Sequence, residues 1–202
     1  MRIMKKNILT KTILMILIVA TFACGGLRFS QSAPEAANFH PKKIAVFPIE
    51  VWNHRDSIDS RKVVEQIVAG SMVEKKWFAT VIDTEALNRH ISDNEELNKM
   101  ITEYMSKLRN LTYSDPDLSR KIGEAIQADA FLMLYVDEWG YAGQDNNKLA
   151  KVGLFMELYD CSTGKLMWKA GHSIQKDYVV IRPELPDVAR ELTRKMISQM
   201  PR

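Results

Sequence analysis

The spacing of the apolar residues changes at Asp129, and this change constrains the fold more than any other feature of the chain. Before Asp129, most apolar residues recur every three or four positions, which is the period of a helix. After it come three strand-like runs, one nearly continuous and two alternating, at 130–139, 151–160 and 166–172. Polar stretches with glycine separate them at 140–147 and 161–164. The pattern predicts a three-stranded antiparallel meander in which 140–147 is the first hairpin loop.

A strand–helix–strand unit is predicted nearer the N-terminus. The apolar run at 42–52 is typical of a strand buried on both faces. Apolar residues then recur at helical spacing over 63–68, after Asp59 and Ser60, either of which can cap a helix. A second strand is expected at 77–83. Two strands joined through a helix in this way pair in parallel with a right-handed crossover.

Two more helices are expected before the meander and one after it. Residues 84–111 are predicted as one helix whose apolar stripe packs on the sheet, with a free face for a partner as the alternative. The stripe consists of Leu97, Met100, Ile101, Tyr104, Met105, Leu108 and Leu111. The next helix begins at Asp115 and Pro116, and the last contains Val188 and Leu192. The predicted fold class is α/β, with a mixed β-sheet flanked by helices in the order βαβ-αα-βββ-α.

The N-terminal region has the composition of an export signal. Its apolar run, residues 13–22, is ten residues long, whereas a membrane-spanning helix needs about 20. Basic residues precede this run, and no acidic residue occurs before Glu35. A basic start, a short apolar centre and small residues at the end are typical of a secretory signal peptide, which we place at residues 1–23.

The end of this signal, Thr21-Phe22-Ala23-Cys24, resembles the lipobox of bacterial lipoproteins. The resemblance implies cleavage between Ala23 and Cys24, and acyl chains such as palmitate on the Cys24 residue. Thr21 departs from the pattern, because a bulky aliphatic residue is commoner there. An ordinary signal peptide followed by an incidental cysteine is the alternative. Gly25 in place of Asp implies, in enteric-type Gram-negative bacteria, export to the outer membrane, with the protein facing the periplasm.

Removal of the signal changes the charge of the chain. Residues 1–23 contain four of the 28 basic residues and none of the 25 acidic residues, so the remaining chain has a net charge near −1. This value does not favour nucleic acid as a partner. Residues 24–41 are mostly small and polar and are predicted to form a flexible tether, followed by a single domain at 42–202. If Cys24 carries lipid, Cys161 has no partner for a disulfide, and it is expected to be a small buried residue.

No catalytic, metal-binding or cofactor-binding set of residues is evident. The four histidines lack a second ligand at a spacing typical of metal sites. His54, Asp56 and Asp59 share a loop that could hold a cation, although helix capping explains this composition better. Asp137 and Glu138 are neighbours on a strand and are expected to point to opposite faces, so they cannot converge as an acid–base pair. We therefore predict a non-enzymatic protein without a cofactor or metal ion.

Two stretches resemble a known family. They are IGEAIQADAFLMLYVDEWGY at 122–141 and ELYDCSTGKLMWKAG at 157–171. The motif residues are Ala128, Asp129, Ala130, Asp160, Gly164, Lys165 and Trp168. They resemble a family of outer-membrane lipoproteins typified by a meningococcal surface lipoprotein antigen, and more distantly the curli-secretion lipoprotein and the N-terminal domain of TolB. The match covers 42–175 and implies a TolB N-terminal-domain-like fold rather than one activity.

The motif residues also have a structural interpretation that does not depend on the family. Asp129 can accept hydrogen bonds from backbone donors where a helix passes into a strand. Gly164 can adopt a positive φ in a turn, and Trp168 can fill a large volume in the core. We therefore expect these residues to be structural.

The resemblance and the residues together favour an outer-membrane-anchored lipoprotein that acts through contacts with an envelope protein or with its own copies. A short edge strand is expected at 177–183, and its residues Tyr178, Val179, Val180 and Ile181 are the candidate partner edge. The alternatives are a subunit or accessory factor of an outer-membrane secretion complex, or an activator of cell-wall synthesis. A cell-wall hydrolase is the least favoured.

Overall fold

The structure is a computed structural model that describes residues 28–51, 58–144 and 147–201. It contains a seven-stranded mixed sheet with the order β1-β7-β6-β5-β2-β4, in which β3 also pairs with β5. The strands are β1 (Phe29–Ser32), β2 (Lys43–Val46), β3 (Glu50–Val51), β4 (Thr80–Ile82), β5 (Ala130–Gln144), β6 (Asn147–Asp160) and β7 (Leu166–Tyr178). The helices are η2 (Pro34–Asn38), α2 (Ile58–Lys75), α3 (Thr84–Ser92), α4 (Glu95–Leu111), α5 (Pro116–Ile126) and α6 (Leu185–Ile197).

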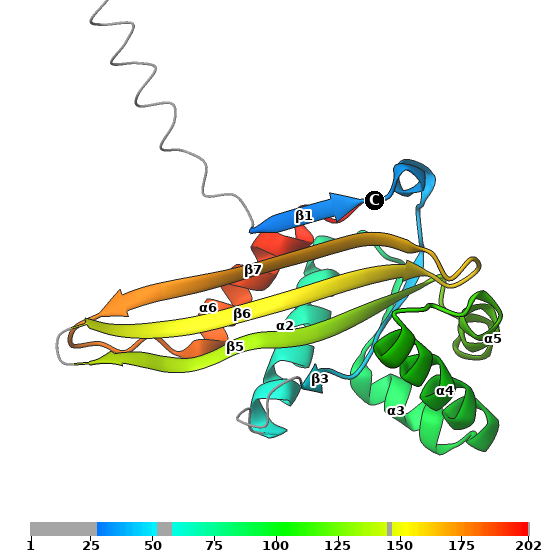
Figure 1. Ribbon diagram of the computed structural model, residues 1–202, viewed down its shortest axis with the longest axis horizontal. Helices are drawn as coiled ribbons and strands as arrows, with labels where there is room; N and C mark the ends of the chain where they lie inside the picture. Colours follow the sequence, from blue (N-terminus) through cyan, green and yellow to red (C-terminus); the bar gives the residue numbers. More distant parts are fainter. Residues whose placement is uncertain (1–27, 52–57, 145–146, 202) are drawn as a thin grey trace, which may run out of the picture.

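The sheet lies between two layers of helices, as the predicted α/β class requires (Figure 1). One face of the sheet packs against α2 and α6, and the core there includes Met72, Trp168 and Leu192. The other face packs against α3, α4 and α5, with Tyr104 and Phe131 in the core. Alternate residues of the central strands β2 and β5 enter the two cores, because successive side chains of a strand point to opposite faces. None of the described helices has the length and apolar composition of a membrane span.

The predicted strand–helix–strand unit is confirmed. β2 precedes α2 in the chain, β4 follows it, and the two strands pair in parallel. The expected continuous strand at 42–52 is divided into β2 and β3. Pro48 lies in the gap and has no N–H to donate to a neighbouring strand. Asp59 and Ser60 lie inside the first turn of α2 instead of capping it.

The region predicted as one helix at 84–111 is two helices, α3 and α4, because Asn94 starts a new one. The Asn94 side chain accepts a hydrogen bond from the Leu97 N–H at 3.0 Å, which is the geometry of an N-cap. The apolar stripe of α4 packs on the sheet as predicted, with Tyr104 fully buried, except for Leu111 at the end of the helix, which is 66% exposed. The start of α5 is also confirmed, because Asp115 caps it and Pro116 occupies its first position.

The antiparallel meander of β5, β6 and β7 is confirmed, but its strands are longer than predicted. The stretch at 140–147 is not a hairpin loop, since β5 continues to Gln144 and β6 starts at Asn147. The polar residues there belong to strands that extend past the helices towards the left of Figure 1. Strand ends without a covering layer bury little side-chain area, so they lack the apolar signal on which the prediction depended.

The prediction of a flexible tether at 24–41 is wrong for most of the residues that the structure describes there. Residues 29–32 form β1, which pairs antiparallel with β7, and 34–38 form the 3-10 helix η2. The Ala33 N–H continues the attachment by donating to the Met167 carbonyl oxygen at 2.9 Å. The folded domain therefore begins near Arg28 and not at residue 42, because an edge strand can be held by backbone hydrogen bonds with few buried side chains.

Candidate interaction surfaces

Asp129 joins the starts of two central strands. One of its carboxylate oxygens, Oδ2, accepts hydrogen bonds from the backbone N–H groups of Lys42 and Lys43, both at 2.8 Å. Asp129 immediately precedes β5, and Lys43 is the first residue of β2. Asp129 therefore accepts hydrogen bonds from backbone donors, as expected, through one of its two carboxylate oxygens.

The turn between β6 and β7 is organised by Asp160. Its carboxylate accepts hydrogen bonds from the Ser162 N–H at 2.9 Å and from the Thr163 hydroxyl at 2.6 Å. Gly164 has a φ of +67°, and a Cβ there would lie 3.0 Å from Pro116 Cα. Lys165 forms an ion pair with Glu35 of η2 at 2.9 Å. The turn thus holds the start of α5 and the N-terminal segment against the sheet.

Trp168 is fully buried in the core beneath α2 and α6. Its indole N–H donates to the Ser30 hydroxyl of β1 at 3.0 Å. The side chains of Asp129, Asp160 and Lys165 are engaged with backbone groups or other side chains. These contacts help to maintain the fold, which is the structural role expected for the motif residues.

The candidate partner edge is only partly strand. Tyr178 is the last residue of β7 and pairs with Lys148 of β6. Val179, Val180 and Ile181 lie beyond the strand, with 73%, 89% and 84% of their surface exposed. The predicted edge strand at 177–183 is therefore wrong beyond Tyr178. The apolar sequence there predicted a strand because a strand is the usual way to bury such residues, and these residues are not buried.

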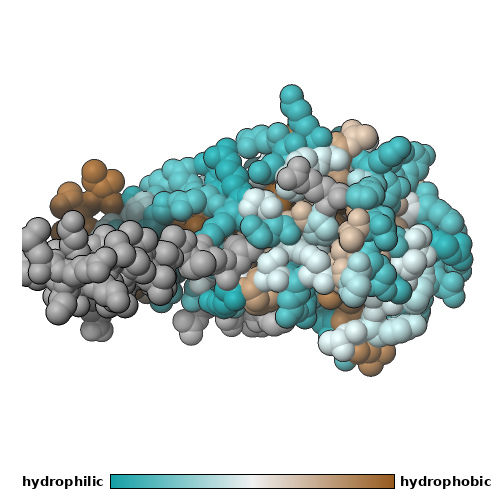
Figure 2. Space-filling view, turned by 90° about the horizontal axis from the view of Figure 1, so that it is seen from above, coloured by the Kyte–Doolittle hydropathy of each residue, from teal (hydrophilic) through white to brown (hydrophobic). Residues whose placement is uncertain are grey.

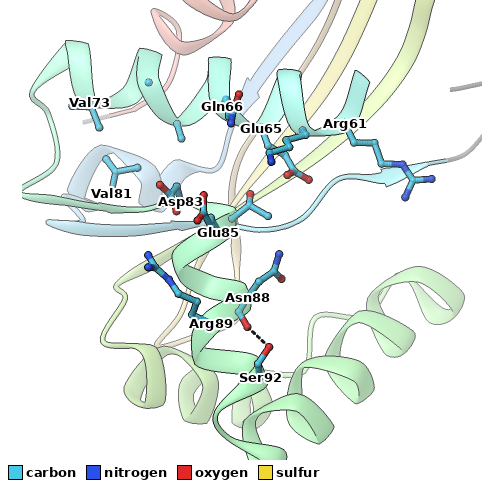
Figure 3. A pocket seen from close by; sticks show the side chains of 14 residues that line it. Arg61, Glu65, Gln66, Val73, Val81, Asp83, Glu85, Asn88, Arg89 and Ser92 are labelled. Carbon is cyan, nitrogen blue, oxygen red and sulfur yellow. Dashed lines mark hydrogen bonds between the residues drawn. The ribbon is translucent and has the colours of Figure 1, made fainter. Parts of the chain in front are cut away.

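A groove of about 870 Å³ lies between α2 and the start of α3 (Figure 3). Glu65 reaches into it from α2, and Asp83 and Glu85 lie opposite at the start of α3. The Asp83 carboxylate caps α3 by accepting the Ala86 N–H at 2.8 Å. Glu65 accepts the Ile49 N–H at 2.8 Å, so two of the groove's acids serve backbone donors and form no acid–base pair.

Burial raises the pKa of Glu65 above its ordinary value of 4.5, although the Ile49 N–H and the nearby Arg61 oppose this effect. Nothing in the sequence distinguishes this residue, because a Glu beside Val64 looks like any solvent-facing helix residue. Only the packing of Ile49, which lies just before β3, against α2 brings the carboxylate to this backbone N–H.

We expect a Glu65→Gln variant to be at least as stable as the native protein at neutral pH, because Gln keeps an acceptor and carries no buried charge. A carboxyl group whose pKa is raised by folding stabilises the fold as the pH falls, since the folded state takes up the proton first. The native protein should therefore gain stability relative to the variant as the pH falls from neutral towards 4.5. Urea unfolding of both proteins across this range tests the prediction, and parallel pH profiles would contradict it.

A smaller hollow of about 400 Å³ lies where β1 meets the meander. The rings of Phe29 and Tyr135 lie on either side of Phe155, with centroid distances of 5.6 Å and 5.7 Å. Gly171 makes room for this row, since a Cβ there would lie 2.5 Å from the Phe29 ring. The hollow could not be predicted from the sequence, because Phe29 lies in the segment expected to be a flexible tether.

His172 lines the same hollow and lies between two basic residues. Its Nδ1 accepts the Arg28 backbone N–H at 3.1 Å, and its Nε2 lies 3.2 Å from Lys195 Nζ. Burial, followed by the charges of Lys195 and Arg28, lowers the pKa of His172 below 6.5. The shift favours the neutral imidazole, in which Nδ1 accepts the Arg28 N–H and the ring proton lies on Nε2.

The remaining chemical candidates do not converge. Cys161 is buried, and burial raises the pKa of its thiol, which disfavours the reactive thiolate. No group of three or more His, Cys, Asp or Glu residues able to hold a metal ion occurs within 28–51, 58–144 and 147–201. Ala23, Cys24, His54 and Asp56 lie outside the described residues.

Comparisons with known proteins identify the fold. No protein-family model and no curated protein matches the sequence. The PelC dodecamer from Paraburkholderia phytofirmans is similar, with 20% identity, a TM-score of 0.53, and coverage of 86% of this chain and 95% of that chain. The hypothetical protein CT253 from Chlamydia trachomatis has 7% identity and a TM-score of 0.50, over 78% of this chain and 94% of that chain.

The lipoprotein GNA1162 from Neisseria meningitidis is also among the similar structures, with 15% identity and a TM-score of 0.49, over 78% of this chain and 99% of that chain. A meningococcal lipoprotein of the kind named in the sequence resemblance is thus found at low identity. Together with the sheet described above, the similarity to PelC confirms the predicted fold class: a mixed α/β sheet flanked by helices.

Proposed function

We propose that the chain is a non-enzymatic lipoprotein of the bacterial cell envelope. In this proposal the lipid on Cys24 anchors it to the outer membrane, and its domain faces the periplasm and acts through contacts with an envelope protein or further copies of itself. The lipobox-like sequence supports the anchor. The dodecamer formed by PelC, which has the same fold, supports self-association.

The observation that carries the proposal is the pairing of β1 with β7. Because β1 starts at Phe29, only residues 25–27 separate Cys24 from Arg28, the first described residue. Four steps of extended chain span at most about 14 Å. A lipid on Cys24 would therefore hold the folded domain against the membrane surface, and the domain would meet its partners there.

The attachment of this segment is firm enough to transmit the anchor to the domain. All four residues of β1 pair with Trp168–Gly171 of β7. The Arg28 side chain adds a hydrogen bond to the Ser173 hydroxyl at 2.9 Å and an ion pair with Asp137 at 3.4 Å. The exposed ion pair contributes little, so strand pairing supplies most of the stability of the attachment.

An edge for partner binding remains on β7 itself. Within the described residues, β1 covers β7 only over Trp168–Gly171, so 173–178 have a strand on one side alone. An unpaired strand edge offers backbone donors and acceptors to another chain. This stretch replaces the predicted 178–181 segment as the candidate edge for an envelope protein or a second copy.

Labelling with palmitate tests the anchor. The native protein should incorporate labelled palmitate and sediment with the membrane fraction, whereas Cys24→Ser should lose the label and move to the soluble fraction. Cys161→Ser is the matched control, because it removes the other cysteine, which is buried, and should keep the label. Equal labelling of the native protein and Cys24→Ser would contradict the proposal.

Cross-linking in intact cells, followed by mass spectrometry, tests the mode of action. We expect a reproducible envelope partner or self-cross-links with the anchored protein, and fewer of them with Cys24→Ser. Turnover of purified cell-wall material that depends on Glu138, His54 or Asp56 would instead show that the protein is a hydrolase.

A further inference from the structure

Three consecutive aliphatic residues project from the end of the long meander. Val179, Val180 and Ile181 are the most exposed large apolar residues in the described part of the chain. They follow β7 at the end of the molecule that extends past the helices (Figure 1). Figure 2 shows a protruding group of apolar atoms, in brown, at that end. We call 179–181 the apolar loop.

The exposure of the apolar loop is maintained by contacts on both sides of it. The ring of Tyr141, from β5, lies edge-on to Tyr178 with a centroid distance of 6.1 Å. The Tyr141 hydroxyl donates to the Pro183 carbonyl oxygen at 2.9 Å, and the Arg182 guanidinium lies over the Tyr141 ring at 4.5 Å. Tyr141 thus holds the residues on either side of the loop, while the three aliphatic side chains remain in solvent.

This arrangement matches the chemistry of a lipid–water interface. Aliphatic side chains form the tip, and tyrosines and an arginine lie immediately behind them. Tyrosine is enriched where the hydrocarbon layer meets the headgroups, and arginine can keep its charge in water while its stem covers apolar surface. A projecting tip also suits insertion into a fluid layer better than a flat interface with a folded protein.

The N-terminal segment leaves the domain close enough to the apolar loop for the loop to reach a membrane that holds Cys24. The Arg28 N–H contacts His172 of β7, and six residues of that strand lead from His172 to Tyr178. At about 3.3 Å per residue this distance is about 20 Å. Cys24 lies only four residues before Arg28. The lipid and the apolar loop can therefore reach the same bilayer, an argument that rests on the proposed anchoring through Cys24.

We propose that the apolar loop inserts into the interfacial layer of a lipid bilayer and is a second membrane contact. Insertion is driven by burial of the aliphatic side chains. Val179, Val180 and Ile181 carry no charge. Their burial therefore requires no anionic lipid and should change little with salt.

An environment-sensitive probe on the loop tests insertion directly. The protein is the chain from residue 24 with Cys24→Ser, which keeps every described residue and carries no lipid. With Val180→Cys added, a thiol-reactive nitrobenzoxadiazole dye labels position 180, because Cys161 is only 4% exposed. Phosphatidylcholine vesicles should shift the emission to the blue and increase it severalfold. Doxyl-labelled lipids should quench it.

Leu111→Cys is the matched control, because Leu111 is an exposed aliphatic residue, 66% accessible, at the end of α4 and away from the loop. Its dye should not respond to vesicles. Equal responses at 111 and 180, or none at 180, would overturn the proposal. A response at 180 that grows with protein concentration without vesicles would show that a second copy covers the loop, and would also overturn it.

A binding measurement completes the test. Replacing all three residues of the loop by serine should weaken sedimentation with phosphatidylcholine vesicles at least about tenfold, at low and at high salt alike. Circular dichroism and the melting temperature should stay unchanged, because the replaced side chains are exposed. Unchanged vesicle binding by this variant would contradict insertion. Because none of these proteins carries lipid, the result is independent of whether Cys24 is acylated.

Discussion

Replacing Trp168 with alanine should lower the free energy of unfolding by about 3–5 kcal/mol, the range measured when a large aromatic side chain is removed from a core. Trp168 is fully buried among residues of α2, α6 and the meander. It also contacts β1 through the hydrogen bond from its indole to the Ser30 hydroxyl. The substitution should therefore weaken the core and the attachment of the N-terminal segment together, as urea unfolding will measure.

Two further measurements separate these effects. Trp168→Phe keeps most of the apolar volume and removes the N–H, so it should cost much less than Trp168→Ala. Ser30→Ala should cost about 1 kcal/mol or less, since it removes one hydrogen bond near the surface. Amide exchange at Ala33, which donates to Met167, should accelerate in Trp168→Ala if β1 loosens. A loss below about 1 kcal/mol in Trp168→Ala would contradict its assignment as a core residue.

Replacing either of two helical glycines with alanine should change the free energy of unfolding, but in opposite directions. In Gly123→Ala of α5, the new Cβ would lie 2.6 Å from Cys161 Cβ and 3.0 Å from the Ala128 carbonyl oxygen. Neither atom is the mobile end of a side chain, so α5 must move away from Cys161 and Ala128, at a cost of about 1–3 kcal/mol. In Gly70→Ala of α2, the Cβ meets nothing within 4 Å. That variant should gain about 0.5–1 kcal/mol, because alanine stabilises a helix interior relative to glycine.

The pair is its own control, because each substitution adds one methyl group to a helix. Thermal or urea unfolding of both variants measures the two signs. Stabilisation by Gly123→Ala would show that α5 does not pack against Cys161 as closely as described, and destabilisation by Gly70→Ala would show that the solvent-facing side of α2 is covered.

The pairing of β1 with β7 changes the picture of how such a protein would sit in the envelope. A tether of 18 residues, as predicted for 24–41, would let the domain move far from its anchor. Three residues between the anchor and the domain would not, so the apolar loop and the edge at 173–178 would both work close to the bilayer. The proposed anchor and the proposed loop contact support each other geometrically, while separate experiments test them.

Much of the fold could be predicted because burial leaves a period in the sequence. The alternation at Val152, Leu154 and Met156 predicted β6, since all three enter the core beneath α2 and α6. The stripe of α4 was predicted for the same reason, and Asp115 and Pro116 located α5 through cap chemistry. The structural roles of Asp129, Gly164 and Trp168 were also predicted, because each follows from a local property of the residue.

The misassigned segments lie where burial does not set the pattern. The residues of β1, FSQS, are mostly exposed and are held by backbone pairing with a strand more than 130 positions away. The far ends of β5 and β6 are polar because no helix covers them. The apolar loop has the opposite character, with apolar residues that remain in solvent. The groove beside Glu65 and the aromatic row at Phe155 also require segments that only folding brings together.

The sequence by itself therefore determined the α/β class, the parallel unit and the meander, because these depend on residue types and their spacing along the chain. The tertiary structure alone decided where the domain begins, how far the hairpin extends and which apolar residues stay exposed. Those features depend on contacts between distant segments. A backbone edge or an uncovered strand end places few demands on side-chain chemistry, and so it leaves little trace in the sequence.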